Sequence, residues 1–324
     1  MPFGLRNAAQ TFQRFMNNNV LQNLEYAEGD QDRVEPFHFC YLDDVIIASD
    51  DEKSHKRHLK LILERFNKFG ITINLGKCTF GASEIEFLGY KVSAEGIKPL
   101  EEKIQAIVNY PKPETVEQLR RFLGMINFYR AHLPHAVDYQ KELNKYLHNS
   151  KKRDKTKINW TEVSEKAFVK CKECLQNSVM LSHPASNVPL ALMTDASNSC
   201  VGAVLQQEIG DQWKPLGYFS KQLSETQQKY STYDRELLAI YLAIQYFRKM
   251  FEGKKLVIYT DHKPLTFAFS RKVSEKETPR RTRQLAYISE FTTDIRHVTG
   301  DKNIVADALS RVETIDCPTI RRFS

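Results

Sequence analysis

Two spacings of apolar residues occur along the first half of the 324-residue chain. Short runs of β-branched and aromatic residues between turn-forming residues predict strands at 37–42, 45–48, 71–74, 85–88 and 90–92. In other segments apolar side chains recur every three or four positions, a spacing that predicts amphipathic helices. These helical segments are residues 8–16, 52–69, 101–109 and 115–129.

Local signals mark where several of these elements end. Asn7 and Thr115 are residue types that cap helix N-termini, and Gln118 follows Thr115 in the capping-box pattern. Gly70 is expected to end the helix before it. The charged run at 149–157 predicts a linker or an exposed loop before a further helix at about 162–176.

A second domain is predicted from about residue 189. A meander of three strands and a long amphipathic helix are followed by alternating strands and helices, an order typical of an α/β sheet with helices packed against it. A basic stretch at 271–283 is predicted to lead into one of these helices. The other expected elements lie at 190–194, 200–207, 213–220, 231–251, 255–260, 293–298 and 303–311.

Composition narrows the class of protein. Hydrophobic residues make up 41% and charged residues 27%, and the 19 Phe, 14 Tyr and 2 Trp argue against disorder. No apolar run has the length of a membrane span, and six thinly spread cysteines fit reduced thiols in an intracellular protein. The net charge of +7 permits an anionic partner without proving one.

Asp43 and Asp44 stand between two predicted strands, and a hairpin turn is one interpretation because Asp favours turns. A two-residue hairpin nevertheless prefers a second residue, such as Gly, that readily adopts positive φ. The two like charges also lie between arms that the pattern predicts to be buried, which costs free energy unless a cation neutralises them. This spacing is compatible with both a plain turn and a metal-binding role.

Carboxylates at the ends of elements form a second candidate set: Asp195, Glu236, Asp261 and Asp307. Asp195 and Asp261 each follow an apolar strand, where α/β sheets place ligand sites. Four converging oxygen donors suit Mg²⁺, and a two-metal site activates water and stabilises the leaving oxygen of a phosphodiester. An ordinary surface or capping role is the alternative for each residue.

A third constellation has the spacing of zinc ligands. Two residues separate Cys171 from Cys174 in the motif Cys-x-x-Cys, and His132 and His135 lie upstream. Both cysteines fall within a predicted helix beside apolar positions, and no second pair completes a closed set of ligands. Helix packing is therefore favoured over a zinc site.

Basic residues cluster at 53–60, 120–121, 151–157 and 271–283. Solvated helix faces and loops are the usual explanation of such clusters. Contacts with phosphates become the better explanation if the clusters share a side with the carboxylates.

Motifs of a known family occur in order along nearly the whole chain. Residues 1–8 (Met-Pro-Phe-Gly-Leu-Arg-Asn-Ala), 11–14 (Thr-Phe-Gln-Arg) and 41–44 (Tyr-Leu-Asp-Asp) resemble palm motifs of reverse transcriptases. Residues 87–90 (Phe-Leu-Gly-Tyr) resemble the primer grip, and residues 119–130 resemble the segment between polymerase and RNase H in gypsy-type LTR retrotransposon Pol polyproteins.

The second half resembles the RNase H domain of the same family. The segments that carry this resemblance are 194–197 (Thr-Asp-Ala-Ser), 233–239 (Tyr-Asp-Arg-Glu-Leu-Leu-Ala), 259–265 and 303–311. The implied fold is α/β: a partial α+β palm at 1–95, a mostly helical thumb and connection at 96–185, and an RNase H-like α/β domain at 186–312. Residues 313–324 resemble the start of a link toward an integrase.

The palm resemblance implies roles for five residues. Asp43 and Asp44 match the two metal-binding aspartates of the palm hairpin, and Phe3 and Gly4 match positions that line the pocket for the incoming nucleotide. Gln13 lies on the helix behind that pocket. The family also has a third palm aspartate on a strand upstream of residues 2–4, so we expect a truncated polymerase that lacks polymerase activity in this chain.

The RNase H resemblance implies a complete catalytic set. Asp195, Glu236, Asp261 and Asp307 match the four metal ligands of the family. His297 lies ten residues before Asp307, where many RNases H have a mobile histidine that aids turnover, and a plain strand residue is the alternative. The implied cofactor is Mg²⁺, two ions per active site, with Mn²⁺ as a substitute.

These features predict Mg²⁺-dependent hydrolysis of RNA in RNA–DNA hybrids, with RNA-directed DNA polymerisation as the activity of the parent enzyme. The implied partners are the hybrid, primer-template nucleic acid and, in the parent enzyme, dNTP. No membrane partner is expected, a dimer is one option, and the expected location is the cytoplasm, in the virus-like particle of the element, or the nucleus. The alternative function is that of a catalytically inactive remnant or subunit that binds nucleic acid.

Overall fold

A computed structural model describes residues 5–24, 37–134, 136–185, 188–210, 212–269 and 278–298. Contacts divide the chain into two compact units. One unit comprises residues 1–88 and 92–94, and the other comprises residues 89–91 and 95–324. The segments predicted as thumb and as RNase H-like domain therefore lie in the same unit.

The first unit is built around the helix–hairpin–helix order that the sequence predicts. Its core contains the buried residues Met16, Val20, Leu21, Leu24, Phe37, Ile62 and Phe66. Its elements are α1 (Ala8–Phe15), the π-helix η1 (Met16–Val20), β1 (His38–Tyr41), β2 (Asp44–Ile47), α2 (Glu52–Lys68), the 3₁₀-helix η2 (Leu75–Lys77) and β3 (Glu84–Phe87).

At the end of α2, one prediction from the sequence is confirmed and another is wrong. Gly70 has φ +67° and ends the helix as expected, because glycine tolerates the left-handed conformation that this C-terminus requires. The strand predicted at 71–74 is wrong, since those residues form no ladder with any strand in the described part of the chain. Its isoleucines therefore lack the hydrogen-bonded neighbour that a strand needs.

The helical part of the second unit packs around buried Leu119, Phe122, Leu143, Phe168 and Leu175. The predicted capping box at Thr115 and Gln118 is present, whereas α5 and β5 were not predicted. The elements are β5 (Gly96–Pro99), α3 (Glu101–Val108), α4 (Val116–Phe128), η3 (Arg130–His132), α5 (Ala136–Lys145) and α6 (Glu162–Gln176). Strand β4 (Tyr90–Ser93) contains residues of both units.

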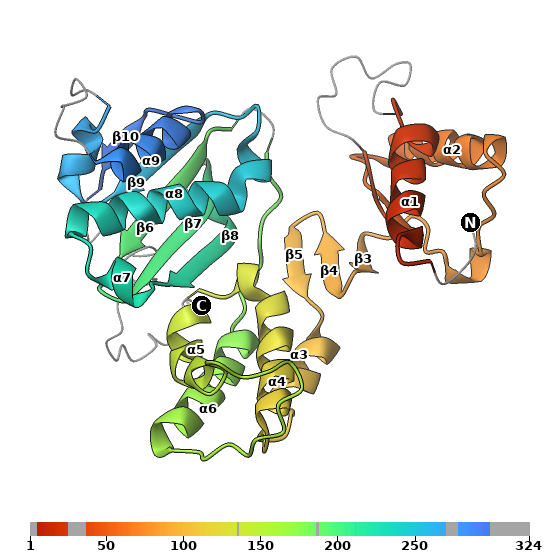
Figure 1. Ribbon diagram of the computed structural model, residues 1–324. Helices are drawn as coiled ribbons and strands as arrows, with labels where there is room; N and C mark the ends of the chain where they lie inside the picture. Colours follow the sequence, from red (N-terminus) through yellow and green to blue (C-terminus); the bar gives the residue numbers. More distant parts are fainter. Residues whose placement is uncertain are drawn as a thin grey trace, which may run out of the picture. The chain divides into compact units, whose positions relative to one another are not determined.

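The same unit contains a five-stranded sheet in the order β10-β9-β6-β7-β8 (Figure 1). Strands β6, β7 and β8 form the predicted antiparallel meander, and β9 pairs in parallel with both β6 and β10. The elements are β6 (Leu190–Ala196), β7 (Cys200–Ile209), β8 (Gln212–Gln222), α7 (Glu225–Gln228), α8 (Thr232–Phe251), β9 (Leu256–Thr260), η4 (Lys263–Phe267), α9 (Pro279–Ser289) and β10 (Ile295–His297).

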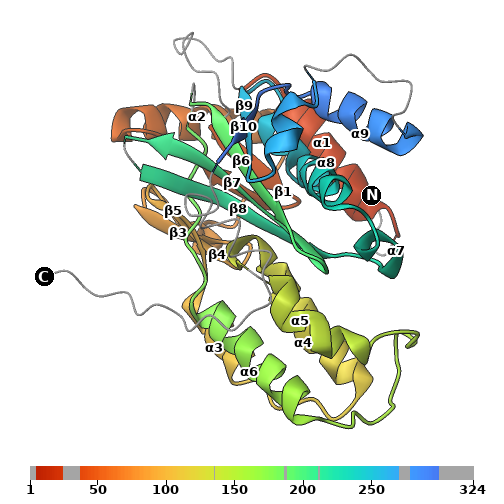
Figure 2. The same ribbon diagram turned by 90° about the vertical axis from the view of Figure 1, so that its left-hand side faces the viewer.

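Helix α8 covers one face of this sheet (Figures 1 and 2). Its buried Leu237, Ile240 and Ile244 join a core with Leu192 and Ile258 of the central strands. A parallel pair cannot be joined by a tight turn, so α8 serves as part of the crossover from the meander to β9. This connection brings the first turns of α8 to the sheet edge where β6 and β9 end.

The close approach of two backbones depends on Gly96. Ile97 and Leu181 exchange hydrogen bonds of 2.7 and 2.9 Å, which bring β5 against the segment that follows α6. Gly96 has φ +149°, and a Cβ atom there would lie 2.2 Å from the carbonyl oxygen of Leu181. Only glycine fits this position without movement of the backbone.

Five of the six cysteines lie in the described residues and all five are free thiols, in agreement with the expectation of reduced cysteines. Cys317 lies outside the described residues. No helix in the described ranges combines the length and the apolar character that a membrane crossing requires.

Candidate active site

Two neighbouring strands bring Asp195 and Asp261 to the same edge of the sheet. Asp195 is the penultimate residue of β6, and Asp261 directly follows β9. The parallel register pairs Met193 with Tyr259, and each aspartate lies two positions beyond its member of this pair. The two carboxylates therefore stand at the same level, at the carboxyl ends of parallel strands where α/β sheets form ligand sites.

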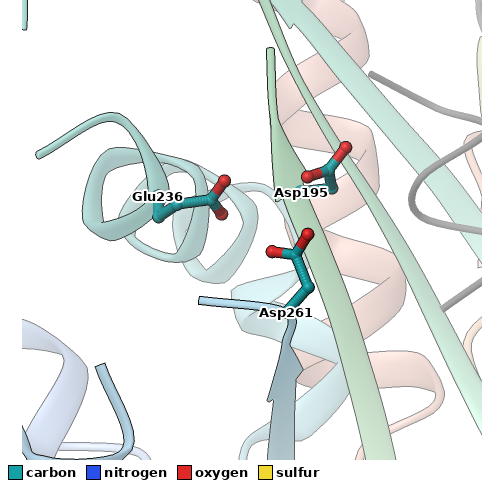
Figure 3. Close-up of side chains that lie close together, drawn as sticks. All are labelled: Asp195, Glu236 and Asp261. Carbon is teal, nitrogen blue, oxygen red and sulfur yellow. The ribbon is translucent and has the colours of Figure 1, made fainter. Parts of the chain in front are cut away.

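Glu236 comes from a third element, the first turns of α8, whose N-terminus is capped by Ser231. The backbone N–H of Ala196 donates to Glu236 Oε1 at 3.2 Å, so the end of β6 orients the glutamate. Ligand oxygens of Asp195, Glu236 and Asp261 all lie within 4.8 Å of one another. Figure 3 shows the three side chains converging from the helix and the two strands.

Burial makes this carboxylate cluster electrostatically unfavourable in the absence of a cation. Asp195 and Glu236 are 5% and 3% exposed. Burial, and then the nearby charges of Asp195 and Asp261, raise the pKa of Glu236 to about 9. Glu236 Oε2 is also buried without a hydrogen-bond partner among the described residues. A divalent cation would satisfy that oxygen and compensate the repulsion, since carboxylate oxygens are ligands that Mg²⁺ prefers.

The remaining residues of the predicted RNase H set have different outcomes. His297 ends β10 and pairs in register with Thr260, the residue before Asp261, so its strand borders the carboxylate cluster. Its side chain is exposed, and it is not a member of the group of three. Asp307 lies outside the described residues.

The palm hairpin forms, but its turn differs from the prediction. Tyr41 pairs with Asp44, so Leu42 and Asp43 make the turn and Asp44 begins β2. Leu42 takes the left-handed conformation, with φ +53°, in place of an aspartate. Asp43 and Asp44 are both exposed, and the expectation that buried arms desolvate them is wrong. Water screens their repulsion, so the burial cost no longer supports a cation there.

Gln13 secures this turn from α1. Its Nε2 donates to the carbonyl of Cys40 at 3.1 Å, and its Oε1 accepts from the N–H of Leu42 at 2.6 Å. The side-chain amide thereby holds the end of β1 and the first residue of the turn. Its predicted role near a nucleotide pocket stays a prediction, and Phe3 and Gly4 of that pocket lie outside the described residues.

An ion-pair network next to Glu236 was missed by the sequence reasoning. Arg280 and Arg281 of α9 both contact Asp234, which is buried in the first turn of α8. Arg280 also stacks on Tyr230 at 3.9 Å, and Arg281 on Tyr233 at 4.8 Å. The Arg281 hydrogen bond, more than any other contact, holds the pKa of Asp234 well below its usual value. Part of the predicted basic stretch is therefore a structural clamp.

The cysteine pair packs in the helical core instead of forming a zinc site. Cys171 is 1% exposed, and burial raises the pKa of its thiol and of Cys174, the latter to about 12. The thiol of Cys174 donates to the carbonyl of Pro134, and His132 Nδ1 lies 2.9 Å from the carbonyl of Val179. His135 lies outside the described residues. Within the described ranges, the carboxylates at 195, 236 and 261 are the sole group with metal-ligand geometry.

Two family models match the chain. Residues 1–92 match the reverse transcriptase (RNA-dependent DNA polymerase) family, and residues 160–258 match the RNase H-like domain found in reverse transcriptase. The second match includes Asp195 and Glu236 and ends three residues before Asp261. The two matches confirm both parts of the resemblance.

Full-length relatives extend well beyond this chain. The retrovirus-related Pol polyprotein from transposon opus of Drosophila melanogaster is 34% identical over 319 residues, which are 96% of this chain and 30% of the relative. The Tf2-3 transposon polyprotein of Schizosaccharomyces pombe is 33% identical over 315 residues, 96% of this chain and 22% of the relative. The chain thus spans less than a third of the length of either polyprotein.

Solved structures confirm the fold. The foamy viral protease-reverse transcriptase in complex with RNA/DNA hybrid has a TM-score of 0.75 at 20% identity, over 98% of this chain and 40% of that one. The same viral protein in complex with dsDNA has a TM-score of 0.71 at 19% identity, over 92% of this chain and 59% of that one. The chain contains a reverse transcriptase segment and an RNase H-like segment, and its sequence is similar to Pol polyproteins of retrotransposons.

Proposed function

We propose that this chain hydrolyses the RNA strand of RNA–DNA hybrids in a reaction that depends on divalent metal ions. The observation that carries the proposal is the convergence of three carboxylates from β6, α8 and β9, with ligand oxygens within 4.8 Å of one another. The family match identifies the domain as RNase H-like, and the carboxylate geometry supports a metal-dependent phosphodiesterase within it.

Asp195, Glu236 and Asp261 are the residues that would hold the ions, and Asp307 would be a fourth ligand. The donor set fits Mg²⁺, or Mn²⁺ in its place, because it consists of carboxylate oxygens. When bound, the ions supply Lewis acidity and neutralise the charge that develops on the phosphodiester.

The chain itself contributes orientation and a low-dielectric setting. The N–H of Ala196 holds one oxygen of Glu236 in place, which leaves the second oxygen free of competing hydrogen bonds within the described structure. Asp195 and Asp261 are fixed by the parallel pairing of their strands. The ligands are therefore placed before any ion binds, and preorganised charge of this kind contributes strongly to catalysis.

The test is cleavage of a labelled RNA–DNA hybrid by the full chain in Mg²⁺. We expect Asp261→Asn to reduce the rate by about a hundredfold or more, since losing one group that stabilises transition-state charge costs that much. Asp294→Asn is the matched control, because Asp294 is an exposed aspartate paired with Arg296 of β10. Equal cleavage by the Asp261→Asn variant and the wild type would overturn the proposal, and binding without cleavage in the wild type would favour a non-catalytic nucleic-acid-binding protein.

A further inference from the structure

The segment between α5 and α6 concentrates positive charge on a short stretch of chain. Residues 150–157, which we call the basic loop, contain one acidic residue, Asp154, and five basic residues: Lys151, Lys152, Arg153, Lys155 and Lys157. All five basic residues are exposed. Among the described residues, none of these five side chains takes part in an ion pair or a hydrogen bond.

The main chain of the basic loop is anchored to the start of α4. The N–H of Val116 donates to the carbonyl of Thr156 at 3.1 Å, and the N–H of Glu117 donates to the carbonyl of Asp154 at 2.9 Å. These two donors belong to the first turn of a helix, where no partner exists within the helix itself. The loop carbonyls supply that partner, so the segment is a fixed part of the fold and not a free linker.

Two side chains complete the anchoring. Arg120 of α4 donates to the carbonyls of Ser150 and Lys151, at 3.3 and 3.1 Å, and to the Ser150 hydroxyl. Asp154 accepts from the N–H and the hydroxyl of Thr156, at 2.9 and 2.6 Å. The single acidic side chain of the loop is therefore engaged locally, and the basic side chains extend from a backbone held at several points.

Several lysines on the described helices are paired with acidic side chains. Four lysines of α2 and α6 form ion pairs with glutamates of their own helix: Lys56–Glu52, Lys60–Glu64, Lys166–Glu162 and Lys170–Glu173. The basic loop instead gathers unpaired cations beside the positive end of the α4 dipole, with the first-turn acid Glu117 as a partial compensation. This arrangement is unfavourable alone and becomes favourable when an anion binds.

We propose that the basic loop is a second contact surface for nucleic acid and holds the sugar-phosphate backbone of the hybrid through residues outside the carboxylate cluster. The proposal rests on the function proposed above. A nucleic acid is favoured over an acidic protein because residues 150–157 include no apolar side chain, whereas protein interfaces bury an apolar centre. Contacts with phosphates position a duplex without reading its sequence, so this surface acts on any hybrid.

The experiment compares two full-length variants that each lose four positive charges. One carries Gln at positions 151, 152, 153 and 155, whose anchoring contacts use only backbone atoms. The control carries Gln at the ion-paired positions 56, 60, 166 and 170. Both also carry Asp261→Asn to keep the hybrid intact, and the Kd for a fluorescent RNA–DNA hybrid is measured against KCl concentration.

We expect the loop variant to bind the hybrid about tenfold more weakly or worse near 100 mM salt, and the slope of log K against log salt to fall by about 2–4, at roughly 0.9 per lost phosphate contact. The control should change the Kd by less than about threefold. Equal effects of the two variants would overturn the proposal, because net charge alone would then explain binding. A loop variant that loses affinity for polyglutamate but not for the hybrid would also overturn it.

These outcomes are separate from those of the proposed hydrolysis. Cleavage by an otherwise unchanged chain, with and without Asp261→Asn, decides the catalytic function. The salt dependence of binding decides the role of the basic loop, and each result stands whatever the other shows.

Discussion

Arg281 binds both carboxylate oxygens of Asp234, with Nε donating to Oδ1 at 2.7 Å and Nη2 donating to Oδ2 at 2.9 Å. Such paired hydrogen bonds fix the orientation of both groups, which a single bond cannot do. The contact ties α9 to the first turn of α8, two residues before Glu236. The carboxylate cluster is therefore supported by a neighbouring pair of opposite charge.

Removal of this contact should destabilise the chain in a pH-dependent way. We expect Arg281→Ala to lower the free energy of unfolding by about 2 kcal/mol at pH 7, because hydrogen bonds to charged groups are worth about that much. The pKa of Asp234 is lowered from 3.8, so the stabilisation is present above that pH and is lost as pH falls through the folded-state pKa. Urea unfolding of the wild type and the variant at a series of pH values measures this loss of stability.

The matched control for that prediction is Arg283→Ala. Arg283 is an exposed arginine of the same helix, and in the described part of the chain its side chain bonds only to the carbonyl of Pro279. Its loss should cost less than about 0.5 kcal/mol, as for other surface substitutions. A cost for Arg281→Ala no larger than this, or one that does not change with pH, would contradict the assigned role.

Glu236→Gln should raise the stability of the metal-free protein while it abolishes hybrid cleavage. The folded-state pKa of Glu236 is raised from 4.5 to about 9, chiefly by burial. A raised pKa favours folding fully below pH 4.5, and that benefit is lost as pH rises toward 9. The gain in melting temperature should therefore be clear at pH 8 in EDTA and absent near pH 4. An unchanged or lower melting temperature of the Glu236→Gln variant at pH 8 would refute this prediction.

Gly96→Ala should be strongly destabilising, by about 3 kcal/mol, because the new methyl group would meet the carbonyl oxygen of Leu181 at 2.2 Å. Gly124→Ala provides the opposite control. Gly124 lies inside α4, and a Cβ there meets nothing within 4 Å. That substitution should stabilise the chain by about 0.5–1 kcal/mol through helix propensity, and thermal unfolding of the two variants compares them.

Gln13→Ala should loosen the palm hairpin without unfolding the rest of the chain. Gln13 makes two hydrogen bonds to the hairpin backbone, whereas Gln10 on the same helix is exposed. Amide hydrogen exchange at Leu42 should therefore accelerate by about tenfold in Gln13→Ala, the equivalent of about 1.4 kcal/mol. Gln10→Ala should leave that rate unchanged. Equal exchange rates in the two variants would exclude this role of Gln13.

Elements with strong local signals were predictable from the sequence. The capping box at Thr115, the glycine at 70 and the apolar face of α8 each act within a few residues, so their pattern is sufficient. The motifs also indicated Asp195, Glu236 and Asp261 as one set, and the geometry brings these three together. The roles assigned to these residues stay predictions.

Other features depend on residues far apart in sequence and left no local signal. The clamp joins Asp234 to an arginine 47 positions later, and its arginines looked like part of a solvated basic stretch. The charged run at 149–157 looked like a linker because its hydrogen bonds go to α4, more than 30 residues earlier. The exposure of Asp43 and Asp44 depends on packing around the hairpin, which alternation of apolar residues did not reveal.

The crossover between β6 and β9 also sets when the carboxylate cluster can exist during synthesis. Asp195, Glu236 and Asp261 come from three elements, and the last of them follows the strand that pairs with the first. A nascent chain that has not yet released β9 from the ribosome has two of these carboxylates and no parallel partner for β6. The carboxylate cluster is therefore completed only after translation has passed β9.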